Sequence, residues 1–341
     1  NKRNAKIKFV FETHFHADFV SGHVDLAKRT GAEIIYGPTA TTAYATTTAS
    51  DGQTFEIGAL RIKVLHTPGH TIESACYLLF DENGIEHAVF TGDTLFIGEV
   101  GRPDLAIKND LSREDLAGML YDSLHNKLMN LPDDVLVYPA HGAGSACGKN
   151  ISNERFSTIG KQKTTNYALQ PMTRDNFVEK VTTGIMPPPQ YFAKNALLNK
   201  NGYEDISTTM ERNNRPLSAE QVENELQNGT LVLDTRNAQI FAKGFIPRSI
   251  NIGLDGSYAS WVGTLIEDLQ HPMVIIAEPG KESEAISRIA RVGYTNVLGY
   301  LQGGFTTWEM AGKPVETIVS ISTDKFSARL QNGKPLSLIH I

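Results

Sequence analysis

Histidine and aspartate side chains recur at four places in this sequence, with a spacing that suits metal binding. The stretch ETHFHADFVSGH places two histidines two residues apart and an aspartate two residues further on. The later stretches HTPGH, TGDTLF and PAHG add further histidines and an aspartate. The candidate ligands, in chain order, are His14, His16, Asp18, His70, Asp93 and His141. Imidazole together with carboxylate suits Zn, Fe or Mn, so the sequence predicts a metal site assembled from separate loops.

Each of these loops follows a predicted β-strand. Short apolar runs have the composition of strands and are separated by turn signals such as Asp51-Gly52. A helix over HVDLAKRT, closed by Gly31, is expected between the first two runs. Open α/β folds place their sites at strand ends, because loops converge there while the sheet holds them rigid. We therefore expect an α/β domain with strands over residues 7–14, 32–38, 60–65, 76–80, 88–90 and 135–138.

Helices and strands also alternate in the second half of the chain. Residues from about Gly160 to Pro216 have no strand pattern and contain Pro187-Pro188-Pro189, which predicts a helical connector or extension. From Leu217 onward we expect helices over 218–229, 261–269 and 282–293 and after Gly303-Gly304, with strands over 230–234, 273–277 and 296–300. Such alternation is typical of a small domain with a parallel sheet.

The composition narrows the class of protein. With 341 residues, of which 40% are hydrophobic, the chain is long enough for two or three domains. A net charge of -6 and scattered lysines and arginines predict no nucleic acid and no membrane as partner. Two cysteines, Cys76 and Cys147, and no apolar run of the about 20 residues that a membrane span needs favour a cytoplasmic protein without a disulfide framework. The sequence leaves a homo-oligomeric state open.

Both ends of the chain suggest a fragment. Only 13 residues precede the first histidine, so we expect supporting strands upstream to be missing. A sheet edge and part of the core would then be exposed, and the isolated chain should express poorly or aggregate. Near the other end, ISTDKFSARLQNGK from Ile321 repeats LSAEQVENELQNGT from Leu217, which predicts the truncated start of a second copy of the C-terminal domain.

The loops THFHAD, TPGH, TGD and PAHG look like the successive signature loops of the metallo-β-lactamase fold, from Ile7 to about Phe156. This resemblance implies an αββα sandwich, here truncated at its N-terminus. In the hydrolases of that fold the first loop reads H-x-H-x-D-H, and its last histidine helps to hold a second metal ion. This chain has Phe19 at that position, and a benzyl side chain offers no lone pair. A mononuclear site is therefore expected, on His14, His70 and Asp93, an arrangement that suits non-haem Fe(II) with open positions for O2 and substrate.

The segments ETHFHADFVSGH, TGDTLFIGEVGRPDL and YPAHGAGSACGK resemble the persulfide dioxygenases (sulfur dioxygenases) of this superfamily. That resemblance implies one Fe(II) per chain, with zinc as the alternative metal. It also implies oxidation of a thiol persulfide, typically glutathione persulfide, by O2 to sulfite and thiol, in sulfide detoxification. The residues implied to orient ligands and substrate by hydrogen bonding are His16, Asp18 and His141.

Two further residues near these motifs each have two candidate roles. Arg102, in GRPDL, would contact a carboxylate of a glutathione-like substrate, since guanidinium pairs bidentately with carboxylate. Its alternative role is a salt bridge with Asp104 that braces the loop. Cys147 could approach the site, although a buried inert thiol is the commoner fate of such a residue, and Cys76 is expected in the core.

The second domain resembles a rhodanese through LDTRNAQIFAKGFIPRSINI and GYTNVLGYLQGGFTTWEMAGKPV. A rhodanese carries sulfur on a cysteine after a buried strand, where this chain has Ala277, and Glu282 stands where the loop commonly has arginine. The domain is therefore expected to be catalytically silent. The expected organisation is a dioxygenase domain over 1–159, the helical connector over 160–216, an inactive rhodanese-like domain over 217–316 and the truncated repeat over 317–341.

Two other functions compete with the persulfide dioxygenase. One is a Zn-dependent hydrolase of the same fold, such as a thioesterase of the glyoxalase II kind, which Phe19 disfavours because hydrolysis in this fold generally uses a hydroxide held between two metals. The other is a binding or scaffold protein whose metal only stabilises it. Ligands carried on loops at an open face argue against that role.

Overall fold

The computed structural model describes residues 5–106, 111–319 and 321–331. The chain divides into two compact units, one formed mainly by the residues up to Ile206 and one by the residues from Ser207 onward. Each unit is described by itself. None of the helices in the described part of the chain combines the length and the apolar character that crossing a membrane requires.

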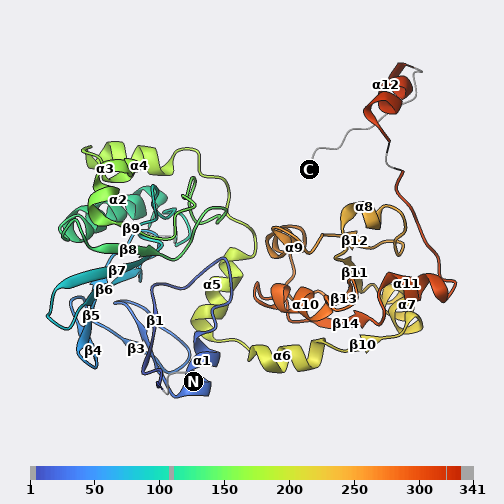
Figure 1. Ribbon diagram of the computed structural model, residues 1–341, viewed down its shortest axis with the longest axis horizontal. Coiled ribbons are helices and arrows are strands. Elements are labelled where there is room, and N and C mark those ends of the chain that lie inside the picture. Colours follow the sequence, from blue (N-terminus) through green and yellow to red (C-terminus); the bar gives the residue numbers. More distant parts are fainter. Residues whose placement is uncertain (1–4, 107–110, 320, 332–341) are drawn as a thin grey trace. The chain divides into compact units, whose positions relative to one another are not determined.

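The first unit contains two sheets (Figure 1). A parallel sheet is formed by β1 (Phe9–Glu12), β2 (Glu33–Tyr36) and β3 (Thr47–Thr48). The second sheet has the order β4-β5-β6-β7-β8-β9, and only β7 and β8 pair in parallel. Its strands are β4 (Thr54–Ile57), β5 (Leu60–His66), β6 (Ala75–Phe80), β7 (Glu86–Gly92), β8 (Leu136–Pro139) and β9 (Ser157–Thr158).

Alternation along β6 divides the core of this unit into layers. Cys76 and Leu78 pack into a cluster with residues of the helices on one face of the six-stranded sheet. Ala75 and Tyr77 point to the other face, where they pack with Ile35 of β2. The helices of the unit are α1 (His23–Thr30), α2 (Arg113–Ser123), the π-helical turn η1 (Leu124–Leu128), α3 (Ile159–Thr165), the 3-10 turn η2 (Tyr167–Leu169), α4 (Arg174–Thr182) and α5 (Phe192–Asn201).

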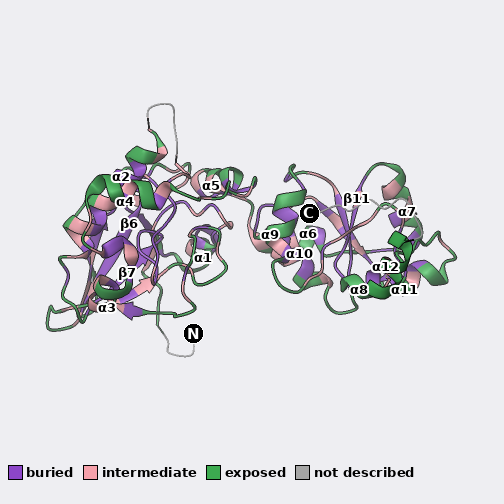
Figure 2. Ribbon diagram, turned by 90° about the horizontal axis from the view of Figure 1, so that it is seen from above, coloured by how far each residue is buried: buried purple, intermediate pink, exposed green. Residues whose placement is uncertain are grey.

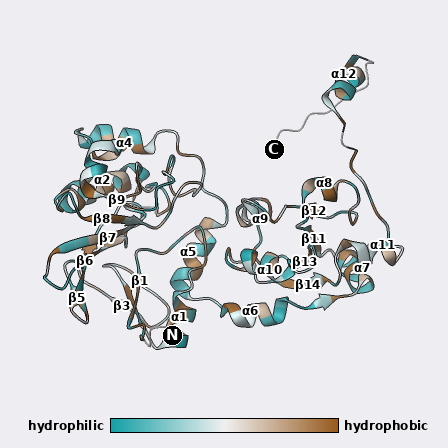
Figure 3. Cartoon of the chain, viewed as in Figure 1, coloured by the Kyte–Doolittle hydropathy of each residue, from teal (hydrophilic) through white to brown (hydrophobic). Residues whose placement is uncertain are grey.

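Helix α1 covers the outer face of the three-stranded sheet, where Ala27 packs against Ile34 and Tyr36. The order of layers is therefore helices, six-stranded sheet, three-stranded sheet and helix, which confirms the expected αββα sandwich. Figure 2 shows β6 as buried over most of its length. Figure 3 shows hydrophilic and hydrophobic residues alternating along the helices, as expected of helices with one buried face.

The predicted helical connector proves to be an extension of the first unit over much of its length. Leu169 and Phe177, from η2 and α4, are fully buried in the cluster on the helical face of the six-stranded sheet. Helix α2 was not expected from the sequence, although Ser112 and Asp115 form a capping box and Leu116 and Leu120 recur at helical spacing. The helical layer is thus built from α2 together with the segment that follows β9.

The second unit has a parallel five-stranded sheet, as expected. The strand order is β10-β14-β13-β11-β12, and every pair is parallel. The strands are β10 (Pro216–Leu217), β11 (Leu231–Asp234), β12 (Ile250–Asn251), β13 (Met273–Ile276) and β14 (Val297–Leu301). The helices are α6 (Ile206–Asn213), α7 (Ala219–Gln227), α8 (Ala238–Phe241), α9 (Tyr258–Leu265), α10 (Glu282–Ala290), α11 (Phe305–Met310) and α12 (Thr323–Gln331).

Two expectations about the ends of the chain stay predictions. The repeat that starts at Ile321 forms helix α12, none of whose residues is buried, and its continuation over 332–341 lies outside the described residues. Apolar surface is exposed on the six-stranded sheet, where Phe90 stacks on Tyr138 and Tyr138 lies against Phe156. The two phenylalanines are 41% and 55% exposed, so aggregation of the isolated chain would be expected to involve this surface.

Candidate metal centre

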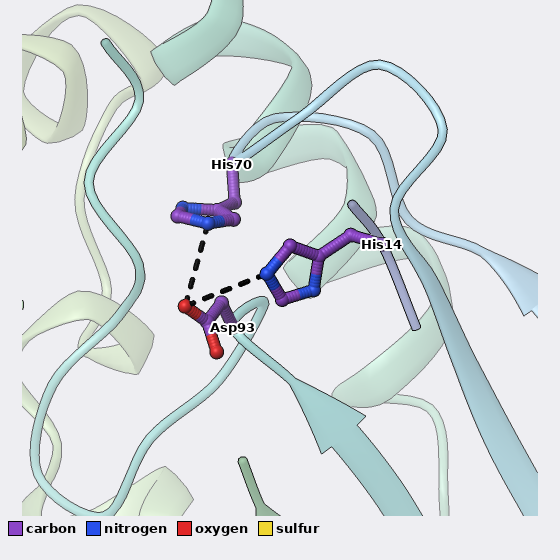
Figure 4. Close-up of side chains that lie close together, drawn as sticks. All are labelled: His14, His70 and Asp93. Carbon is purple, nitrogen blue, oxygen red and sulfur yellow. Dashed lines mark ion pairs between the residues drawn. The ribbon is translucent and has the colours of Figure 1, made fainter. Parts of the chain in front are cut away.

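Three of the predicted ligands converge at the strand ends of the first unit (Figure 4). His14 follows β1, His70 lies between β5 and β6, and Asp93 follows β7. Nε2 of His14 lies 3.8 Å and Nε2 of His70 lies 3.3 Å from Oδ2 of Asp93. All three residues are about 1% exposed, and one ligand atom from each lies within 4.8 Å of the others. The geometry leaves space for one ion between two imidazoles and one carboxylate.

Neighbouring groups orient the two rings. Nδ1 of His70 donates to the carbonyl oxygen of Arg102 at 2.9 Å, which fixes its tautomer and leaves the lone pair of Nε2 toward Asp93. Nδ1 of His14 is bonded to the hydroxyl of Thr13 at 2.9 Å. Gly101 permits the close approach of the loop with Arg102, since a Cβ there would lie 1.9 Å from the carbonyl oxygen of Asp93.

The chemistry of these groups fits a bound cation. Both carboxylate oxygens of Asp93 are buried without a hydrogen-bond partner, a costly state unless a cation balances them. Burial, with a smaller contribution from the neighbouring histidines, lowers the pKa of His14 well below its ordinary value. The ring is therefore neutral, which is the form that binds metal.

The other three predicted residues form a second group around the same carboxylate. Nε2 of His141 lies 3.5 Å from Oδ2 of Asp18 and 3.4 Å from Oδ1 of Asp93. Ligand atoms of His16, Asp18 and His141 also lie within 4.8 Å of one another. Burial lowers the pKa of His16 to about 4 and raises the pKa of Asp18. The sequence assigned these residues a hydrogen-bonding role, but Nδ1 of His16 and Nε2 of His141 have no hydrogen-bond partner, so the group could itself hold an ion.

Comparison with known proteins identifies the fold and the family. Residues 1–141 match the family profile of the metallo-beta-lactamase superfamily, and residues 218–311 match that of the rhodanese-like domain. A hydroxyacylglutathione hydrolase of Dictyostelium discoideum is 32% identical over 197 residues, which are 57% of this chain and 67% of that protein. The chain belongs to the metallo-beta-lactamase superfamily.

One solved structure extends the likeness beyond the first unit. A metallo-beta-lactamase from Staphylococcus aureus subsp. aureus COL is 28% identical, with a TM-score of 0.76 over 88% of this chain and 85% of its own. ETHE1 from Myxococcus xanthus is 29% identical, with a TM-score of 0.49 over 58% of this chain and 79% of its own. The chain spans between 48% and 67% of the length of the curated hydroxyacylglutathione hydrolases that it matches.

Phe19 lies beside the second group of candidate ligands, which is formed by His16, Asp18 and His141. Its ring is stacked on the ring of His16, with centroids 4.6 Å apart and planes at 25°. Its centroid lies 6.3 Å from that of His141, with the planes nearly perpendicular at 82°. The side chain therefore packs against two candidate ligands of a second ion without offering a ligand atom of its own.

Arg102 has the bracing contact that the sequence suggested as its alternative role. Its Nε and one terminal nitrogen donate to the two carboxylate oxygens of Asp104 at 2.6 and 2.8 Å. The guanidinium also donates to the carbonyl oxygens of Ala146 and Met186, and the residue is only 6% exposed. A substrate carboxylate would therefore have to share this guanidinium with Asp104.

Cys147 is buried, as expected of an inert thiol, and it also approaches the centre. Its sulfur lies within 4.8 Å of ligand atoms of Asp93 and His141. Burial, reinforced by the charge of Asp93, raises the pKa of this thiol well above its ordinary value. Cys76, as expected, is fully buried in the core, where it meets the hydroxyl of Thr67.

A cavity of about 790 Å³ lies beside the loop between β1 and α1, which carries several of the candidate ligands. Phe15 and Ala17 of that loop form part of its wall, and Phe192 and Leu197 of α5 form another part. Lys200 brings a positive charge to the same cavity. This cavity could not be predicted from the sequence, because α5 belongs to a segment without any motif.

In the rhodanese-like domain, Ala277 follows the buried strand β13 and is 2% exposed. In the loop after it, the amide of Gly280 donates to Oε2 of Glu282 at 2.8 Å, so a carboxylate of the chain itself occupies this amide. A rhodanese needs such loop amides for an anionic sulfur. Glu282 therefore adds a second obstacle to the missing cysteine.

We predict that Ala277→Cys alone will not restore sulfurtransferase activity, because the carboxylate of Glu282 competes for the loop amides and repels an anionic donor. The double variant Ala277→Cys with Glu282→Arg should be at least about 10-fold more active, which corresponds to about 1.4 kcal/mol. Thiocyanate formation from thiosulfate and cyanide measures both, with Glu282→Arg alone as the control. Equal rates of the single and double cysteine variants would show that Glu282 is no obstacle.

Proposed function

We propose that the first unit oxidises a thiol persulfide, such as glutathione persulfide, with O2 at a single non-haem Fe(II). The observation that carries this proposal is a complete set of two histidines and one carboxylate, together with the ring of Phe19, which packs against His16 and His141 of the neighbouring group without offering a ligand atom. Such a set with open positions suits iron that meets both O2 and a substrate. One O2 and one water are consumed for each persulfide, and the products are sulfite and the thiol.

The residues of this chain have separate tasks in the proposed reaction. His14, His70 and Asp93 would hold the iron, which supplies the electron transfer to O2 when it is bound. The carbonyl of Arg102 holds the ring of His70 in its ligating tautomer. The cavity along α5 has room for the carrier of the persulfide and would orient it beside the metal loops. In this proposal a carboxylate of the carrier would meet the one N–H of the Arg102 guanidinium that does not already donate to Asp104, Ala146 or Met186.

A Zn-dependent thioesterase of the glyoxalase II kind is the second candidate. Two observations favour it: the curated relatives are named hydroxyacylglutathione hydrolases, and the group of His16, Asp18 and His141 could hold another ion next to Asp93. Phe19 argues against the thioesterase, because hydrolysis through a bridged metal pair needs a full set of ligands for both ions and a phenylalanine supplies none.

Oxygen uptake separates the two candidates. The chain would be loaded anaerobically with Fe(II) or with Zn(II) and then given glutathione persulfide or a hydroxyacyl-glutathione thioester. We expect oxygen consumption and sulfite only with iron and persulfide, and thioester cleavage at the background rate with either metal. Thioester cleavage with zinc and no oxygen uptake with iron would favour the hydrolase instead.

A further inference from the structure

The loop between β1 and α1 carries His14, His16, Asp18 and Phe19, and its backbone is irregular. Its start is held by the sheets, where the amide of Ala75 donates to the carbonyl of Thr13 at 2.9 Å. The part after His16 has no strand or helix to fix it. What holds Asp18 and Phe19 in place is therefore a question that the metal motif itself does not answer.

Asn199, near the end of α5, makes three hydrogen bonds to this loop. Its Nδ2 donates to the carbonyl oxygens of His16 and Phe19, both at 2.8 Å, and its Oδ1 accepts from the amide of Ser21 at 2.8 Å. The residue is 0% exposed. Both donors and the acceptor of the amide are thus used on one loop, on either side of Asp18.

Two tyrosines strengthen the same contact. The hydroxyl of Tyr44 donates to the carbonyl oxygen of Asn199 at 2.6 Å. The hydroxyl of Tyr203 donates to the carbonyl oxygen of Ser21 and accepts from the amide of Val24 at 3.3 Å. The end of α5 and the residues after it are therefore bonded to the loop at several points, over a separation of about 180 residues along the chain.

We propose that Asn199 is a positioning residue of the metal centre. Its hydrogen bonds to the loop hold the ring of Phe19 on His16 and the carboxylate of Asp18 near His141. This inference rests on the proposed metal site. The ligands His14 and His70 are oriented by other groups, so loss of Asn199 should leave the ion bound and disturb its surroundings on the Asp18 side. Groups that orient a metal centre in this way typically affect activity about 10- to 100-fold.

The test compares Asn199→Leu with Asn195→Leu, one turn earlier on α5. Asn195 is also fully buried, but its side-chain nitrogen and oxygen have no hydrogen-bond partner, so its replacement is a matched control. Tyr203→Phe is a milder second variant that removes only the hydroxyl bonded to Ser21. The measurements are metal content, the visible spectrum of the Co(II)-loaded protein, amide hydrogen exchange over residues 16–21, and kcat and KM.

We expect Asn199→Leu to keep about one metal ion per chain, to exchange the loop amides faster, to shift the Co(II) spectrum, and to lower kcat by about 10- to 100-fold with a smaller change in KM. Tyr203→Phe should change exchange and spectrum in the same direction, and it decides the matter if Asn199→Leu does not fold. Exchange and spectra equal to those of Asn195→Leu would overturn the proposal. The Co(II) spectrum and the exchange need no substrate, so a wild-type protein without oxygen uptake would count against the proposed function and not against this role of Asn199.

Discussion

The variant His70→Ala is expected to lose bound iron and to lower kcat/KM by more than about 100-fold, beyond what the loss of an orienting neighbour costs. His70 is one of the three proposed ligands, and its ring is held toward Asp93 by the carbonyl of Arg102. Without it the buried carboxylate of Asp93 retains only His14 from the triad. Iron per chain after anaerobic purification and the rate of oxygen uptake measure the two effects.

His87→Ala is the matched control for this experiment, since His87 lies on the strand that precedes Asp93 and is exposed. It should keep its iron and its kcat/KM. Circular dichroism of both variants shows whether they are folded. A folded His70→Ala protein with one iron per chain and wild-type kcat/KM would exclude His70 as a ligand.

The variant Phe19→His is expected to raise zinc binding from one to two ions per chain and to introduce thioester hydrolysis, while persulfide oxidation falls. The ring at this position lies against His16 and near His141. An imidazole there would complete a second ligand group with Asp18, His141 and the shared carboxylate of Asp93. Zinc per chain and the rate of cleavage of a hydroxyacyl-glutathione thioester are the quantities to measure.

Phe19→Leu separates the chemistry of the imidazole from the removal of the aromatic ring. Leucine is apolar and smaller, and it has no ligand atom, so this variant should stay at one ion per chain. If Phe19→Leu and Phe19→His both bind a second zinc ion, the phenylalanine ring excludes that ion by occupying its space and not by lacking a nitrogen ligand. If neither variant binds a second ion, Phe19 does not determine the metal count.

The proximity of the three proposed ligands could be predicted from the sequence because each lies in a loop that follows a strand. A buried strand such as β6 or β7 is recognisable from local composition, and the loop that follows it has a fixed place at the sheet edge. For this reason the expected set of His14, His70 and Asp93 meets at one point. The parallel sheet of the rhodanese-like domain was predictable on the same grounds.

The contacts that could not be predicted join residues far apart in the chain. Asn199 lies in a segment without strands or motifs, and nothing near it in the sequence indicates that its amide meets His16 and Phe19. Arg102 pairs with Asp104 nearby, but it is buried by contacts with the distant carbonyl oxygens of Ala146 and Met186, so its bracing role was foreseen only as one of two choices. Such contacts depend on how the helical layer packs on the sheet, which local patterns do not encode.

The number of metal ions per chain tests the central claim most directly. The protein would be loaded anaerobically with 57Fe(II), and its iron content and Mössbauer spectrum would be measured on the same sample. We predict one iron per chain and a single high-spin ferrous site. Two irons per chain in a coupled pair would contradict the mononuclear centre, and with it the proposed oxidation of persulfides.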